Sequence, residues 1–215
     1  PFACLEQKTS KAVGLRDSKL WQSVAGQLPS YLDADGLANY FPPRDGETNH
    51  GSDTLTAYLL ATTHEAATLA PAFALSDEVR APMERGLIAF VEGRIQRNAW
   101  SPRSGKGGDL DVRKLAALEA LSRYGKAQGR MLGSITIAPN QWPTHAVIDW
   151  VNILKRVQDV PQHDQRLLEA LQILRSRISH QGSKLVFSTE KDDYWWWLMQ
   201  NGDVNTARLM LAVMD

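Results

Sequence analysis

The chain contains a single cysteine, Cys4, and a glutamine, Gln7, follows it three residues later. Side chains at positions i and i+3 of a helical turn lie on the same face, close enough to touch. A thiol held against a carboxamide can displace ammonia and leave an internal thioester. Such a bond is a stored electrophile, because the thiolate leaves readily when an amine or a hydroxyl attacks the carbonyl. The spacing of these two residues indicates acyl-transfer chemistry.

This chemistry competes with a simpler interpretation of the same residues. A lone cysteine in a helical protein is usually a small buried hydrophobe, and Glu6 and Gln7 would then be ordinary exposed helix formers. A thioester also has to be kept from water, and Phe2 is a candidate for part of that shield. With only one cysteine, an internal disulfide and a multi-thiolate zinc site are both excluded.

Other groups of residues offer alternative chemistry. The carboxylate pair of a glycosidase would come from among Asp109, Asp111, Asp149, Asp192 and Asp193. Aspartates beside helix starts are far more often caps. The three tryptophans 195–197 point in different directions on a helix, which favours core anchoring over ligand stacking. The glycine-rich stretch 105–108 lacks the spacing of a phosphate loop, and Cys4 lies inside the Glu-Gln motif and not in a zinc ligand set. We expect neither a cofactor nor a metal.

Helical periodicity runs through nearly the whole chain. After a capping sequence at 51–53, apolar positions recur at steps of three or four through Leu55, Leu59, Thr62, Ala66 and Leu69. A second helix starts at Ser76 or Asp77, and its expected apolar face comprises Val79, Met83, Leu87, Phe90 or Val91, and Ile95. Further helices are predicted over 109–124, from 143 to about 158, from 164 to about 179, and over 203–215.

Strand signals are scarce. The segments 134–137 and 184–187 are short and follow glycine-containing turns, so we interpret both as connections between helices. The polar stretches 42–46 and 101–108 are predicted to be exposed loops. Helices recur in loose pairs without a residue-level repeat, which suits stacked helical hairpins. The predicted class is all-α.

Composition narrows the possible partners. The chain has 215 residues, 43% of them hydrophobic, with 24 basic residues balanced by 24 acidic ones. This length suits one sizeable core, and zero net charge gives no reason to expect nucleic acid or an anionic membrane surface as a partner. No apolar run approaches the roughly 20 residues that a membrane span needs, and no signal peptide is visible.

Residues 1–10 read Pro-Phe-Ala-Cys-Leu-Glu-Gln-Lys-Thr-Ser. They resemble the thioester segment of the bacterial alpha-2-macroglobulin family, which usually has Tyr-Gly before Cys-Leu-Glu-Gln. Vertebrate macroglobulins and thioester complement proteins carry Cys-Gly-Glu-Gln, so Leu5 points to the bacterial branch. Later segments also resemble the family, in the same order: 51–57, 107–111 with 115–118, 142–144 with 146–150, 187–190, 195–199 and 202–205.

The resemblance implies an α/α toroid of paired inner and outer helices, with the thioester at one end and covered by a neighbouring domain. In this family a protease cuts a bait region elsewhere, the protein rearranges, and the exposed thioester acylates a lysine of that protease. Carried over to this chain, Cys4 is the acyl carrier, Gln7 supplies the carbonyl, and Leu5 and Glu6 complete the motif, with the role of Glu6 left open. Ala3 replaces the family's glycine, and it would be strained if that position needs a positive φ.

The resemblance further implies a single thioester-containing domain over residues 1–215, an incomplete piece of the toroid of a much larger protein. Its partners would be target proteases, bound covalently, and shielding domains of the same protein. The expected location is the periplasm, with a lipoprotein anchor to the inner membrane as one option, and the expected role is host defence. A trap that reacts once is an inhibitor module and not an enzyme.

In some complement relatives a histidine farther along the chain attacks the thioester first and so favours hydroxyl targets. The corresponding loop here, residues 99–104, has no histidine, and His145 lies too far on. We therefore expect lysine amines to be better targets than sugars or water. Two rival functions stay open: a toroidal glycosidase- or cyclase-like enzyme using acidic residues, and a family member that has lost its thioester.

Overall fold

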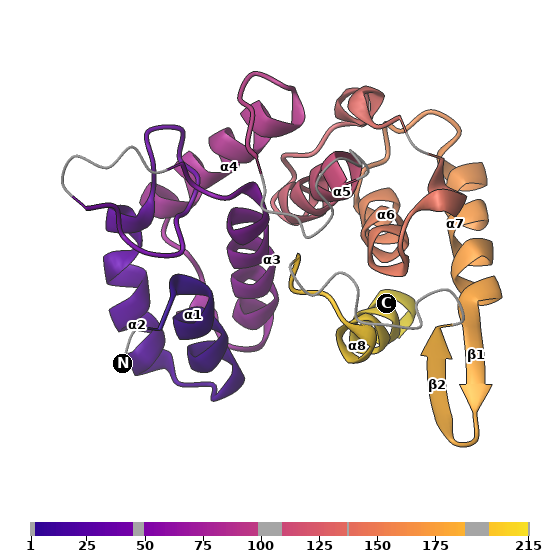
Figure 1. Cartoon of the computed structure of the whole chain (residues 1–215), viewed down its shortest axis with the longest axis horizontal. Coiled ribbons are helices and arrows are strands. Elements are labelled where there is room, and N and C mark those ends of the chain that lie inside the picture. Colours follow the sequence, from indigo (N-terminus) through magenta and orange to yellow (C-terminus); the bar gives the residue numbers. More distant parts are fainter. Residues whose placement is uncertain (1–2, 45–49, 99–108, 137, 188–197, 215) are drawn as a thin grey trace. The chain divides into compact units, whose positions relative to one another are not determined.

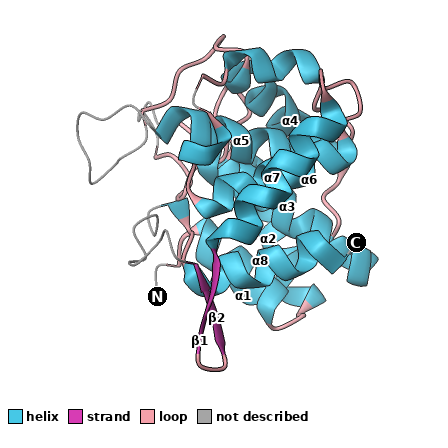
Figure 2. Cartoon of the chain, turned by 90° about the vertical axis from the view of Figure 1, so that its right-hand side faces the viewer, coloured by secondary structure: helices cyan, strands magenta, loops and turns pink. Residues whose placement is uncertain are grey.

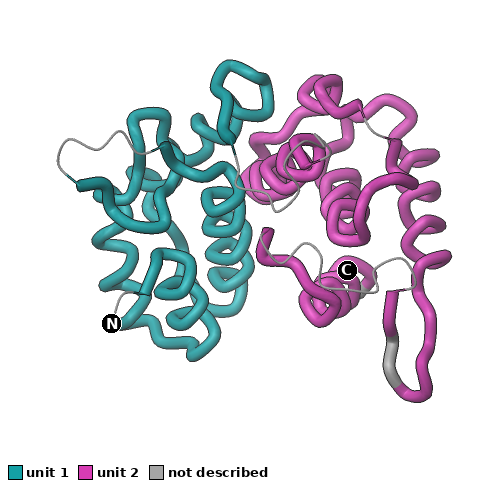
Figure 3. Tube along the Cα trace, in the orientation of Figure 1, with its two compact units in different colours: residues 1–99 teal, residues 100–215 magenta. Residues whose placement is uncertain are grey.

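The computed structural model describes residues 3–44, 50–98, 109–136, 138–187 and 198–214, and most of these residues are helical (Figure 1). The prediction of an all-α chain is confirmed, since a two-stranded hairpin is the only sheet within the described ranges. The chain divides into two compact units, residues 1–99 and 100–215, which Figure 3 colours separately. Among the described helices, none is both long and apolar enough to cross a bilayer.

The first unit is built from helices that pack on their neighbours in the chain. α1 lies against α2 and α3, and α3 lies against α4, so successive helices form hairpins. The elements are α1 (Leu5–Gly14), α2 (Ser18–Gln27), η1 (Leu28–Tyr31), α3 (Asp53–Leu69), η2 (Pro71–Phe73) and α4 (Asp77–Val91).

Side-chain caps fix where these helices begin. Ser52 accepts a hydrogen bond from the N–H of Leu55 at 3.2 Å, which confirms the predicted start of α3. Asp17 does the same for α2, accepting from the N–H groups of Lys19 and Leu20 at 3.1 and 2.9 Å. The helix α2 was not among the helices predicted from periodicity.

The core of the first unit corrects two details of the predicted stripes. Leu55 and Leu59 are buried, but Leu69 in the last turn of α3 is 79% exposed. The buried face of α3 includes Leu60, which the predicted stripe did not contain. The helix α4 ends at Val91, so Ile95 lies beyond it and not on its apolar face.

In the second unit, α6 (Thr144–Arg156) packs against α5 (Asp109–Ser122), α7 (His163–Arg177) and α8 (Gly202–Met214) (Figure 2). This central position explains why nearly every residue of α6 is buried. The predicted helices at 109, 143, 164 and 203 are thus present, with ends shifted by a few residues. Two short 3₁₀ helices, η3 (Gly129–Ser134) and η4 (Pro139–Gln141), connect α5 to α6.

The interpretation of residues 184–187 as a connection between helices was wrong. They form β2 (Lys184–Phe187), which pairs antiparallel with β1 (Ile178–Gln181) directly after α7. The pairing of Gln181 with Lys184 leaves a two-residue turn, and Gly182 supplies a φ of 62°, the left-handed conformation that such hairpin turns need. The helix α7 therefore ends at Arg177, where the hairpin begins, and not near residue 179.

Candidate functional site

Cys4 is the N-cap residue of α1, where the chain passes from extended backbone (φ −70°, ψ 168°) into the helix. Its carbonyl accepts the N–H of Lys8 at 3.0 Å, and the next residue, Leu5, is fully buried. The N–H of Leu5 donates to the carbonyl of Tyr40 at 2.8 Å, which ties the start of α1 to the segment before α3. The position of Cys4 is thus fixed by the buried residue that follows it.

The structure brings the predicted pair, Cys4 and Gln7, together in this first turn. The N–H of Cys4 donates to Oε1 of Gln7 at 3.2 Å, and the Cys4 side chain lies toward the N–H of Gln7, the reciprocal pattern of a capping box. Cys4 is half-buried and Gln7 is exposed, so neither is part of the core. A backbone N–H thus polarises the carbonyl of a carboxamide in the same helical turn as a thiol.

The neighbouring acid, Glu6, faces the same thiol. The Cys4 Sγ donates a long, weak hydrogen bond to Glu6 Oε2 at 3.9 Å. The other carboxylate oxygen, Oε1, accepts from Ser10 Oγ at 2.8 Å, and Ser10 Oγ lies 2.7 Å from the hydroxyl of Tyr58 on α3. A chain of polar contacts therefore runs from the thiol to a second helix.

Sequence reasoning did not identify Ser10 and Tyr58 as members of the site. The spacing of Glu6 and Ser10, i and i+4 on one helix, was a usable signal, because such residues face each other. Nothing local indicated Tyr58, which reaches the site only through the packing of α3 against α1.

Tyr40 is a further neighbour that the sequence did not indicate. Burial raises the pKa of Tyr40, a hydrogen bond with Ser52 opposes this, and repulsion from the neighbouring acids Glu6 and Asp53 raises it further. Its side chain is 36% exposed. Phe2, the predicted shield, lies outside the described residues, and the structure places Tyr40, like Tyr58, beside the site.

Ala3 stands where the segments that this motif resembles usually have glycine, and it is the first residue that the structure describes. The strain expected for an alanine at a left-handed position stays a prediction.

The candidate acidic residues of the rival enzyme make structural contacts. Asp111 accepts hydrogen bonds from the N–H and hydroxyl of Thr136 at 2.9 and 3.1 Å. Asp109 lies 3.8 Å from Arg113 on the same helix. Asp192 and Asp193 lie outside the described residues. These contacts fit capping and loop anchoring better than catalysis.

Asp149 belongs to a buried ionic cluster in the second unit. It pairs with Arg208 of α8, while Glu119 of α5 accepts from Arg123 at 3.0 Å and from Arg156 at 3.1 Å. Burial raises the pKa of Asp149 to about 6, against the opposing effect of Arg208. Two carboxylates that are buried and paired with arginines are poorly placed to meet a sugar ring.

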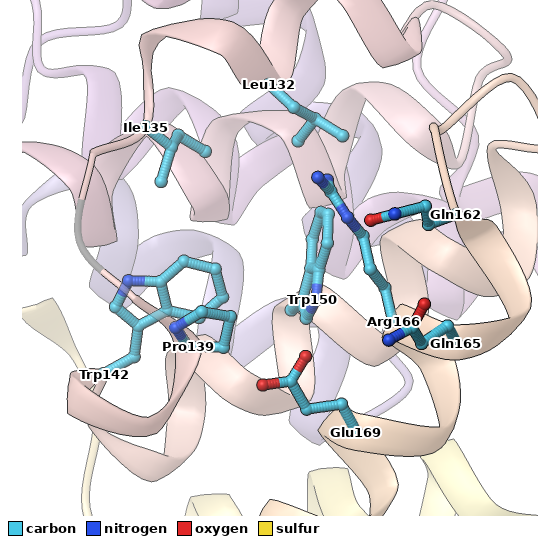
Figure 4. Close-up of a pocket in the computed structure, with 9 residues that line it drawn as sticks. All are labelled: Leu132, Ile135, Pro139, Trp142, Trp150, Gln162, Gln165, Arg166 and Glu169. Atoms are coloured by element: carbon cyan, nitrogen blue, oxygen red, sulfur yellow. The ribbon is translucent and has the colours of Figure 1, made fainter.

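A separate cavity of about 330 Å³ lies in the second unit between α6, α7 and the two short 3₁₀ helices (Figure 4). The indoles of Trp142 and Trp150 meet edge to face on one side of it, with their centroids 5.9 Å apart. Polar side chains of α7, among them Arg166 and Glu169, line it from another side. No serine, cysteine, threonine or lysine is among the residues that line this cavity.

No described group of three or more His, Cys, Asp or Glu residues is arranged to hold a metal ion. Comparison of the chain with family models, curated proteins and solved structures finds no match. The functional proposal therefore depends on the Cys4–Gln7 geometry and on the sequence motif.

Proposed function

We propose that this chain is the thioester-bearing part of a protease-trapping protein of the bacterial alpha-2-macroglobulin type. The observation that carries the proposal is the pairing of Cys4 and Gln7 in the first turn of α1, with the Gln7 carbonyl held by the Cys4 N–H at 3.2 Å. The motif supplies the residue types, and this hydrogen bond supports the proposal because it holds both residues in one helical turn.

The bond would form by attack of the Cys4 thiolate on the Gln7 amide carbon. A C–S bond forms, the C–N bond breaks, and ammonia leaves. The negative charge that develops on Oε1 in the intermediate is stabilised by the N–H that already contacts this oxygen. A lysine amine of a captured protease then attacks the thioester, an amide bond forms, and the thiol is released. Each site reacts once, so the module is an inhibitor and not a turnover enzyme.

The exposure of the pair supports the need for a cover. An exposed Gln7 and a half-buried Cys4 leave the carbonyl open to solvent, and water would hydrolyse a thioester held there. We propose that other domains of the full-length protein shield this face until a protease cuts a bait region elsewhere. Tyr40 would be one contact of that cover, and the periplasm the compartment in which the trap acts.

For the architecture we propose that the helical hairpins of residues 1–215 belong to one thioester-containing domain of the α/α toroid kind. The packing of α1 on α2, α3 on α4 and α5 on α6 supports this, because toroids are built from such hairpins. A cyclase- or glycosidase-like enzyme is the less supported function, since Asp109, Asp111 and Asp149 are engaged in structural contacts.

The proposal is tested by methylamine, a small amine that stands in for the lysine of a protease. Incubation of freshly purified protein should add one methylamine at Gln7 and release one titratable thiol at Cys4. The variant Cys4→Ala should show neither, while its circular dichroism stays that of the wild type. Labelling that persists in Cys4→Ala would rule out a thioester.

A further inference from the structure

Glu6 is the only member of the Cys-Leu-Glu-Gln motif whose role the proposed function leaves open. Its two carboxylate oxygens have separate partners: Oε2 faces the Cys4 thiol at 3.9 Å, and Oε1 accepts from Ser10 at 2.8 Å. We propose that Glu6 is the acid–base residue of thioester formation, with Ser10 and Tyr58 as the residues that position it. This inference rests on the proposed function, because it assigns a role within that reaction.

The contacts of Ser10 explain why the carboxylate would stay in place. Ser10 Oγ contacts the Glu6 carbonyl at 2.8 Å, the Glu6 Oε1 at 2.8 Å and the Tyr58 hydroxyl at 2.7 Å. A hydroxyl has one proton and two lone pairs, so it can donate to Glu6 while it accepts from Tyr58. Because Tyr58 comes from α3, the packing of two helices fixes the side chain that would otherwise rotate freely at the start of α1.

The proposed step balances as an intramolecular acyl transfer. Glu6 Oε2 takes the proton from the Cys4 thiol, and the thiolate attacks the Gln7 amide carbon to form the C–S bond. The electron pair of the carbonyl moves to Oε1 of Gln7, where the Cys4 N–H stabilises it. The protonated Glu6 returns its proton to the amide nitrogen, the C–N bond breaks, and ammonia leaves. Glu6 ends as it began, as a carboxylate.

The place of Glu6 in the fold makes a purely structural role the competing explanation. An acid in the first turn of a helix stabilises the helix through the partial positive charge of that end. A structural role predicts a change in stability on removal of the charge, whereas an acid–base role predicts a change in the rate of thioester formation.

The chain offers a matched control for this distinction. Glu78 occupies the same position in α4 that Glu6 occupies in α1, the second residue of a helix in the same unit, and it is exposed. The variant Glu78→Gln therefore removes a first-turn charge away from the thiol. Any loss of stability that comes only from removing a charge at a helix start should be the same in the two variants.

The experiment follows thioester formation in the full chain after refolding from denaturant under reducing conditions. The readouts are the loss of one ammonia by intact mass and the loss of the titratable thiol, measured over a range of pH. We expect Glu6→Gln to slow formation about a hundredfold near neutral pH, the lower end of the usual range for acid–base catalysis, and Glu78→Gln to leave the rate unchanged. For Ser10→Ala and Tyr58→Phe we expect the rate of thioester formation to fall about tenfold, because the Glu6 carboxylate stays but is less well oriented.

The pH profile separates proton transfer from positioning. With Glu6→Gln, hydroxide has to remove the thiol proton, so the rate should rise with pH and the difference from wild type should shrink. Wild-type rates in Glu6→Gln, or a difference that stays constant with pH, would overturn the acid–base role while leaving the thioester intact. If position 7 of the wild type is still an unmodified glutamine and takes up no methylamine, the proposed function fails, and this inference fails with it.

Discussion

The backbone N–H of Cys4 donates a hydrogen bond to the side-chain carbonyl of Gln7 at 3.2 Å, across the first turn of α1. This contact joins the side chain of a glutamine to the backbone of the residue that carries the only thiol in the sequence. The contact has the geometry of a capping box, which in many proteins only stabilises the start of a helix. In the proposed function, the same two residues also react with each other.

Replacing Gln7 by glutamate should separate these two uses. Glutamate keeps the length of the side chain and the acceptor for the Cys4 N–H, so the free energy of unfolding should change by no more than about 0.5 kcal/mol. The carboxylate offers no ammonia to expel, so Gln7→Glu should not form the thioester and should not incorporate methylamine. Denaturant unfolding and peptide mass spectrometry measure the two effects. Methylamine uptake at position 7 in this variant would contradict the assignment of Gln7 as the acyl donor.

The intact thioester should prefer amines to hydroxyls. An uncharged amine attacks without a general base, whereas an alcohol needs one, and residues 99–104 of the sequence include no histidine to act as a relay. Methylamine should therefore label Gln7 at neutral pH far faster than glycerol at equal concentration. Comparable labelling by the two nucleophiles would indicate another base, and His50→Ala and His64→Ala would then test which histidine provides it.

The stability of the second unit should depend on His145 at mildly acidic pH. Burial, with a smaller contribution from Arg208, lowers the pKa of His145 to about 3 from its ordinary 6.5. The unfolded chain binds a proton at this residue below pH 6.5 and the folded chain does not, so this group destabilises the fold as the pH falls. Asp149 acts in the opposite sense, since its pKa is raised to about 6, and the two effects partly cancel in the wild type.

The variant His145→Gln isolates the histidine contribution, because the titration of Asp149 is common to both proteins. Relative to the wild type, the variant should gain about 2 kcal/mol in free energy of unfolding between pH 7 and pH 5. Urea unfolding at several pH values measures this difference. Parallel stability curves for the two proteins would show that His145 is protonated in the folded state or is not buried.

Asp33 should stabilise the segment that carries Tyr40 to the site. Its carboxylate accepts from the N–H groups of Gly51 at 2.7 Å and Leu37 at 2.9 Å and pairs with Arg97 at 2.8 Å. Burial alone would raise the pKa of Asp33, but these hydrogen bonds and the Arg97 charge lower it overall. We expect Asp33→Asn to lower the free energy of unfolding by about 2 kcal/mol at pH 7, since it replaces a carboxylate acceptor by an amide donor among buried partners.

The pH dependence of this loss has a definite sign. Because the pKa of the folded state lies below the ordinary value of 3.8, the carboxylate stabilises the fold above that pH, and this stabilisation is lost as the pH falls through the lowered pKa. The difference in free energy of unfolding between wild type and Asp33→Asn should therefore shrink only in strong acid. A difference that disappears already at pH 5 would contradict the lowered pKa.

The sequence predicted those parts of the structure that depend on local patterns. Ser52 as a cap identified the start of α3, and the i, i+3 spacing correctly placed Cys4 and Gln7 in one turn. The hairpin β1–β2 was missed because residues 178 and 179 continue the apolar and polar pattern of α7, and only the two-residue turn at Gly182 decides the pairing. The local signal of Asp17 as a cap of α2 was present but was not used.

The rest of the site depends on tertiary packing and was beyond sequence patterns. Tyr58 contacts Ser10 because α3 packs on α1, and Tyr40 reaches Leu5 through a backbone hydrogen bond between segments far apart in the chain. The burial of His145 and Asp149 in one ionic cluster likewise depends on how α8 docks onto α6. Phe2 and the tryptophans 195–197 lie outside the described residues, so the predictions for them stand as predictions.

The central claim is tested most directly by the chemical state of residue 7 in freshly purified protein, read by intact and peptide mass spectrometry in the wild type and in Cys4→Ala. An intact thioester predicts a wild-type mass lower than the encoded mass by one ammonia. A thioester that water has opened predicts glutamate at position 7 and a free thiol at Cys4. In both cases Cys4→Ala should retain unmodified glutamine. Unmodified Gln7 in the wild type, or the same modification in Cys4→Ala, would contradict the account.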